Sequence, residues 1–276
     1  KQHMLLRNRI VLGATCALVL LGASLTILGE LSDRRANARF EAVAIESKQI
    51  VWRKVMAEQI GAMESNTRTF MRNRDAIEAL QNGVIDDIYD EFAPSFNRLN
   101  ASKVLDRLRV TNAVGKLVFA EPELPPETEP ALIAKSIASG KIETGLVQDG
   151  DQLVAAVAFP LFAKQRLVGA VMLGRTVSIA ASSLKEADAA EIIVLAPGGT
   201  ILASTMETPP ENAAKFAIEN GSASYAVLQQ GDLAYAAISL PILTFAGEAG
   251  GTLLVLKDQT EAYNDQRQMK LISYAL

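Results

Sequence analysis

The chain has 276 residues, of which 49% are apolar, and its 27 Lys and Arg against 31 Asp and Glu give a net charge of −4. This composition predicts a folded protein of one large or two modest domains and excludes collagenous and disordered classes. The acidic balance argues against nucleic acid as a partner. One histidine, His3, and one cysteine, Cys16, exclude an intramolecular disulfide, a Ser-His-Asp triad and histidine-based metal sites. We therefore expect no nucleic acid partner, no metal and no cofactor.

Residues 10–29 carry no charged side chain and follow a basic segment, residues 1–9. Twenty helical residues at about 1.5 Å each span the roughly 30 Å hydrocarbon core of a bilayer, which predicts a transmembrane helix. The basic segment predicts a cytoplasmic tail at residues 1–9 and places Glu30 and the following residues on the other side of the membrane. A cleaved signal peptide is the alternative, because the small residues 22–24 follow a basic N-terminal region.

The region 30–100 is predicted to be a long helix followed by shorter helices. Neither glycine nor proline occurs between Glu30 and Ile60, and the first glycine and proline placed to end a helix are Gly83 and Pro94. A stripe with a seven-residue period can pack against a twin helix or against its own domain. We predict a parallel homodimer through this N-terminal helix. The stripe consists of Met56, Met63, Phe70 and Ile77.

After Asn100 the pattern changes to short β-rich runs, and the chain repeats itself. The first copy opens with LRVTNAVGKLVFAE and the second with IIVLAPGGTILAST, and each predicts two strands joined by a turn, at Gly115 and Gly199. Each copy continues with a proline-rich loop, a helix (131–139 and 212–220) and three more strands. The same elements in the same order indicate a duplicated domain.

This element order is that of a PAS-like sheet, and the whole chain resembles the double Cache (dCache) sensor domains of bacterial transmembrane receptors. The most specific phrases are VTNAVGKLVFAE, AFPLFAKQRLVGAVMLG and SLPILTFAGEAGGTLLVLKDQT. The fold class implied is α+β, with a transmembrane helix that continues into a long stalk helix and then two tandem PAS-like antiparallel-sheet units. The implied boundaries are a membrane-distal unit at 101–176, a connecting helix at 177–189, a membrane-proximal unit at 190–260 and, at 261–276, a helix leading to a second transmembrane span.

The resemblance implies a sensor rather than an enzyme. A small molecule would bind in the periplasm, beyond the bacterial inner membrane, and a helix shift would reach an output module beyond residue 276, such as a kinase, a chemoreceptor coil or a cyclase. The alternative is a membrane-anchored interaction subunit whose Cache units bind a protein partner. Catalytic motifs are incomplete, and paired carboxylates such as Asp149 and Asp151 have the context of a solvated turn.

The ligand hypothesis rests on charge at the strand ends. Cache units that bind amino acids commonly place an acidic residue near the end of the last strand, and the second copy keeps one, Asp258, whereas the first copy has Arg175. Arginine pairs with a carboxylate or phosphate. We therefore predict an anionic ligand such as an organic acid, with Arg175 as its principal contact. Strand alternation places Arg107 and Arg109 on one face, as further ligand contacts or exposed to solvent; an arginine at a strand end is ordinarily solvated.

Overall fold

A computed structural model describes residues 2–124, 130–219 and 222–275, with few side chains described before residue 34. The chain divides into two compact units, residues 1–46 and 47–276. Within the described part of the chain, no helix is long and apolar enough to cross a membrane. Most side chains of the predicted span, residues 10–29, lie outside that part.

The predicted long helix is confirmed as α1 (Gln2–Met71), a continuous helix of 70 residues. Its first part, up to Glu46, is the first unit, and in it the side chains of Phe40 and Val43 are exposed. The second unit contains the rest of α1 and all other elements.

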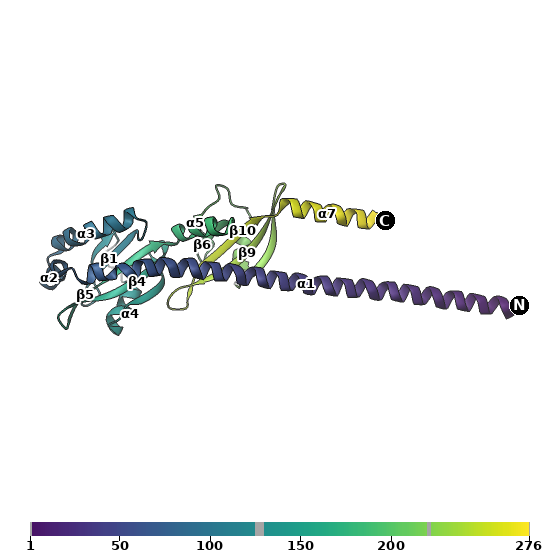
Figure 1. The fold of residues 1–276 in the computed structure, drawn as a ribbon, viewed down its shortest axis with the longest axis horizontal. Helices are drawn as coiled ribbons and strands as arrows, with labels where there is room; N and C mark the ends of the chain where they lie inside the picture. The colour runs from purple at the N-terminus through teal and green to yellow at the C-terminus, as the bar shows by residue number, and fades with distance from the viewer. Residues whose placement is uncertain (1, 125–129, 220–221, 276) are drawn as a thin grey trace. The chain divides into compact units, whose positions relative to one another are not determined.

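The second unit alternates helices with two groups of strands (Figure 1). Its helices after α1 are α2 (Arg74–Asn82), α3 (Ile85–Ala101), α4 (Ala131–Ser139), α5 (Val177–Asp188), α6 (Ala213–Glu219) and α7 (Thr260–Ala275). The first five strands are β1 (Arg107–Asn112), β2 (Leu117–Glu121), β3 (Glu143–Asp149), β4 (Gln152–Ala163) and β5 (Arg166–Thr176). The next five are β6 (Glu191–Leu195), β7 (Ile201–Ser204), β8 (Ser224–Gln230), β9 (Leu233–Leu243) and β10 (Ala249–Asp258).

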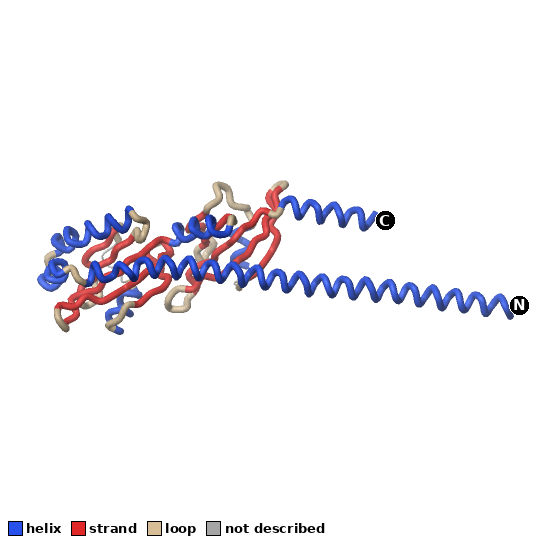
Figure 2. The backbone as a smooth tube through the Cα atoms, viewed as in Figure 1, coloured by secondary structure: helices blue, strands red, loops and turns tan. Residues whose placement is uncertain are grey.

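These strands form two antiparallel sheets of identical topology, which confirms the two tandem sheet units expected from the repeat (Figure 2). The first sheet has the order β2-β1-β5-β4-β3 and the second β7-β6-β10-β9-β8. The duplication extends to single residues. A Cβ on Gly169 would lie 2.3 Å from the carbonyl oxygen of Thr111, and a Cβ on Gly251 would lie 2.3 Å from that of Leu195. Each sheet therefore needs a glycine where its last strand passes closest to its inner neighbour, β5 beside β1 and β10 beside β6.

The predicted seven-residue stripe of α1 packs on its own domain. Met56, Met63 and Phe70 are only 7%, 0% and 1% exposed in the single chain. The ring of Phe70 lies 5.5 Å from that of Phe92 on α3 and 6.4 Å from that of Phe159 on β4. Of the two uses left open for this stripe, the structure shows packing within its own domain, because these three side chains are already buried in the single chain. The homodimer through the N-terminal helix stays a prediction. Ile77, the fourth member of the stripe, belongs to α2.

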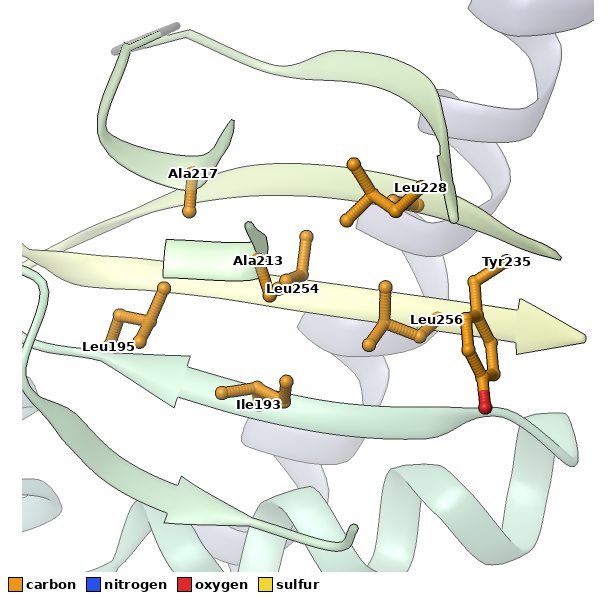
Figure 3. Packing of buried hydrophobic residues seen from close by; sticks show 9 residues of the cluster. Ile193, Leu195, Ala213, Ala217, Leu228, Tyr235, Leu254 and Leu256 are labelled. Carbon is orange, nitrogen blue, oxygen red and sulfur yellow. The ribbon is translucent and has the colours of Figure 1, made fainter. Parts of the chain in front are cut away.

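The second sheet has a core of its own beneath α6 (Figure 3). Ala213 and Ala217 of α6 pack with Ile193 on β6 and with Leu254 and Leu256 on β10. The helix α5 joins the two sheets, and at its end Asp188 is ion-paired with Lys48 of α1 at 2.5 Å. The two sheets are thus linked through α5, whose end is ion-paired with α1.

Candidate functional site

Two of the predicted site residues lie on β1 and share the face of the first sheet that α4 covers. Arg109 pairs in register with Met172 of β5, and Arg107 pairs with Gly174. Met172 packs in the apolar cluster that includes Leu132 of α4. Because strand neighbours in register point to the same face, both arginines point toward the side of α4. The sequence left open whether these two arginines are solvated; the structure buries both side chains.

Asp149, at the end of β3, holds both arginines. The Nε and Nη2 atoms of Arg109 donate to Oδ1 and Oδ2 of Asp149 at 3.1 and 2.7 Å, and Nη1 of Arg107 donates to Oδ2 at 3.2 Å. The side chains of Arg109, Asp149 and Arg107 are 0%, 3% and 13% exposed. Nη1 of Arg109 also donates to the carbonyl oxygen of Glu121 at 2.7 Å. The geometry is bidentate, the arrangement in which an arginine–carboxylate pair is strongest.

This cluster contains two positive charges and one negative charge. Arg109 is satisfied by the carboxylate and by backbone carbonyls, whereas Nε of Arg107 is buried and has no hydrogen-bond partner among the described residues. A buried donor without a partner is costly, and so is a buried charge without a counterion. The segment after β2 approaches the same end of the sheet, since a Cβ on Gly150 would lie 3.5 Å from Leu124. Arg107 is therefore the member of this cluster that keeps an unused buried donor.

Arg175, the predicted principal contact, lies on the opposite face. It pairs in register with Ala155 of β4, which shares the face of Phe159, and Phe159 packs against α1 through Phe70. Strand alternation separates this face from that of Arg107 and Arg109. The structure thus brings two of the three predicted residues together and keeps the third apart.

Arg175 lies at the end of β5, just before α5 begins. Burial lowers the pKa of the Arg175 guanidinium, and the nearby Asp106 carboxylate partly offsets this effect. Asp106 accepts a hydrogen bond from the backbone N–H of Thr176 at 3.0 Å, at the start of α5. Nε of Arg175 is buried without a hydrogen-bond partner in the described part of the chain.

Asp149 was missed by the sequence analysis, which assigned it with Asp151 to a solvated turn. Asp151 is indeed exposed, but Asp149 is buried. Strand alternation could have predicted its burial. Val147, two residues earlier on the same strand, shares its face and packs in the cluster beneath α4.

Asp258, the acidic residue of the second copy, caps a helix. Its Oδ1 accepts hydrogen bonds from the backbone N–H and the hydroxyl of Thr260 at 2.8 and 2.6 Å. These bonds lower the pKa of Asp258, and the side chain stabilises the start of α7.

A groove of about 710 Å³ lies away from these residues. It is formed by the ends of α1 and α2 and by the turn between β4 and β5. Its lining includes the cations Arg72, Arg74 and Lys164 beside Phe162. None of the sequence-predicted site residues lines it.

Residues 56–263 match the family model dCache_3, described as the double sensory domain of two-component sensor kinases. The chain belongs to this dCache family. The resemblance stated from the sequence is confirmed, and the family is defined by a sensory role rather than by catalysis. No curated protein sequence matches the chain.

Several solved structures are similar to this chain. The periplasmic domain of Vibrio cholerae LuxQ is 12% identical, with 77% of this chain and 99% of that chain covered and a TM-score of 0.54. A domain of a sensory box/GGDEF family protein from Vibrio parahaemolyticus is 13% identical, with 79% and 95% covered and a TM-score of 0.47. The sensor domain of the V. cholerae histidine kinase DctB is 11% identical, with 79% and 98% covered and a TM-score of 0.45. At such identities, the likeness to LuxQ supports the fold alone.

Proposed function

We propose that this chain is the extracytoplasmic sensing region of a transmembrane receptor and that its first sheet binds a small organic anion through Arg107. The observation that carries the proposal is the charge surplus at the end of β3, where two arginines share the single carboxylate of Asp149. Membership of a sensory family supports the general role. Residues 10–29 would anchor the chain in a bacterial inner membrane, with residues 1–9 in the cytoplasm and the sheets in the periplasm.

The three arginines have different roles in this proposal. Arg109 is held in place by Asp149 and positions the carboxylate. Arg107 contacts the ligand, because it shares that carboxylate and keeps a free buried donor. Arg175 lies on the other face of the sheet, so it does not contact a ligand bound at Arg107. A ligand that binds one arrangement of this site better than another shifts the population, and a few kcal/mol of differential affinity suffices.

The first prediction concerns Arg107. We expect thermal-shift screening of the purified chain against organic acids, amines and amino acids to show stabilisation by organic acids. Titration calorimetry should then show an affinity at least about tenfold weaker in Arg107→Gln, since a charge-assisted hydrogen bond is worth about 1.5–3 kcal/mol. Arg175→Gln is the matched control and should bind as the wild type does.

Two outcomes contradict this prediction. Stabilisation by amines alone rejects an anionic ligand. Loss of binding in Arg175→Gln with retention in Arg107→Gln moves the site to the α1 face of the sheet.

The second prediction concerns assembly. Since the stripe with Met56 is buried, a parallel dimer through α1 needs other residues, and Phe40, Val43 and Ile50 are exposed apolar side chains at spacings of three and seven. In membranes, with Cys16 replaced by serine, single cysteines at these three positions should cross-link to their counterparts, and a cysteine at Met56 should not. Uniform failure to cross-link contradicts the dimer.

A further inference from the structure

The loop between β9 and β10 of the second sheet docks on the first sheet. The backbone N–H of Phe245 donates to the carbonyl oxygen of Leu146 on β3 at 2.9 Å. Its ring packs against the apolar cluster beneath α4, and Nζ of Lys135 on α4 lies 5.6 Å from the ring centroid. The loop thus contacts both the edge strand of the first sheet and the helix that covers it.

The docking point fits only a residue without a side chain. A Cβ on Gly145 of β3 would lie 2.6 Å from Cβ of Phe245, and Gly145 has φ +155. A second close approach adds to the contact, because a Cβ on Gly250 of β10 would lie 3.3 Å from Leu153 of β4. Contacts this close at two points mean that the loop cannot stay where it is if β3 and α4 move.

The strand on which the loop docks is the strand that carries the carboxylate of the candidate site. Leu146 and Asp149 are both on β3, three residues apart, and Val147 between them packs in the same cluster as Phe245. On the other side, β10 runs from the loop to Asp258, which caps α7. A continuous path of packed elements therefore joins Asp149 to the start of the last helix.

We propose that Phe245 transmits a shift of β3 at the anion site to β10 and α7. This inference rests on the proposed function for the nature of the signal: an anion bound at Arg107 would weaken the hydrogen bond from Arg107 to Asp149 and so shift the end of β3. The shift of β3 and α4 would then move Phe245 and, with it, the end of the second sheet that leads into α7. The coupling itself is a property of the contact and needs no ligand, which allows a ligand-free test.

The test uses Asp149→Asn as a stand-in for release of the carboxylate and measures amide hydrogen exchange in the full chain. In the wild-type background, the substitution should speed exchange about fivefold in β3 and also in β9, β10 and the first turn of α7, as expected for roughly 1 kcal/mol of local destabilisation. In a Phe245→Ala background the effect should stop at the first sheet. Leu243→Ala, on the same hairpin but with an exposed side chain, is the matched control and should transmit the effect fully.

A second variant distinguishes loss of the docking contact from loss of stability caused by removing the Phe245 ring. Gly145→Ala pushes the loop away without removing the ring, and it should block transmission as Phe245→Ala does. The proposal is overturned if Asp149→Asn alters β10 equally with and without Phe245, or alters β3 and leaves β10 unchanged in the wild type. Failure of the organic-acid screen would count against the proposed function alone, since no ligand enters this experiment.

Discussion

Replacing Asp149 with alanine is expected to lower the free energy of unfolding by about 3–5 kcal/mol, the cost of removing one partner from a buried ion pair. The substitution would leave the fully buried guanidinium of Arg109 and the largely buried one of Arg107 facing each other without a counterion. It would also remove three hydrogen bonds of 3.2 Å or shorter. Urea unfolding of the purified chain, followed by circular dichroism, measures the loss.

The control is two residues away. Asp151→Ala alters an exposed carboxylate of the same turn and should change stability by no more than about 0.5 kcal/mol. Removing both charges tests the cause, because Arg109→Met combined with Asp149→Ala should recover part of the loss. A loss below about 1 kcal/mol in Asp149→Ala would mean that the two arginines find other partners.

The architecture could be predicted because its signals are local and repeated. Glycine turns and apolar strand runs recur with the same order in both copies, so an error in one element is corrected by its counterpart. Strand alternation was also sufficient to place Arg107 and Arg109 on one face, as the structure has them. The second sheet then follows from the first, down to the glycines at 169 and 251.

The candidate site could be predicted only in part, because it depends on which face of each strand is covered. Strand alternation puts Arg175 and Met172 on opposite faces, but the sequence does not say which face α4 covers and which face α1 covers. Asp149 was assigned to solvent because it precedes a Gly-Asp turn, which is a local signal. The two arginines that need a counterion lie about 40 residues away, on β1, and such a non-local pairing leaves no local pattern.

The stripe of α1 shows a similar ambiguity. A seven-residue period says that one helix face is apolar, and it does not say what the face contacts. In the structure this face contacts its own domain, because Phe70 packs against Phe92 of α3 and Phe159 of β4. A contact between two copies through α1 would therefore use exposed apolar side chains nearer the N-terminus, such as Val43 and Ile50.

Phe70→Ala is therefore expected to cost about 3–5 kcal/mol, the range for removing a buried phenylalanine. The ring is 1% exposed and contacts two other rings, so its removal leaves a cavity where α1, α3 and the first sheet meet. The single tryptophan, Trp52, is on α1 and is also buried, so its fluorescence during urea unfolding reports whether α1 detaches with the rest of the domain. Met71→Ala, at the neighbouring position and 37% exposed, should cost no more than about 0.5 kcal/mol.

Repeating this experiment at several protein concentrations distinguishes packing of the stripe within its own domain from packing in a dimer. If Phe70 stabilises its own domain, the loss in Phe70→Ala is the same at every protein concentration. If Phe70 instead stabilises a dimer, wild-type stability falls on dilution and the difference between wild type and variant shrinks with it. We expect the first result, because the packing of Phe70 on Phe92 and Phe159 is complete within one chain.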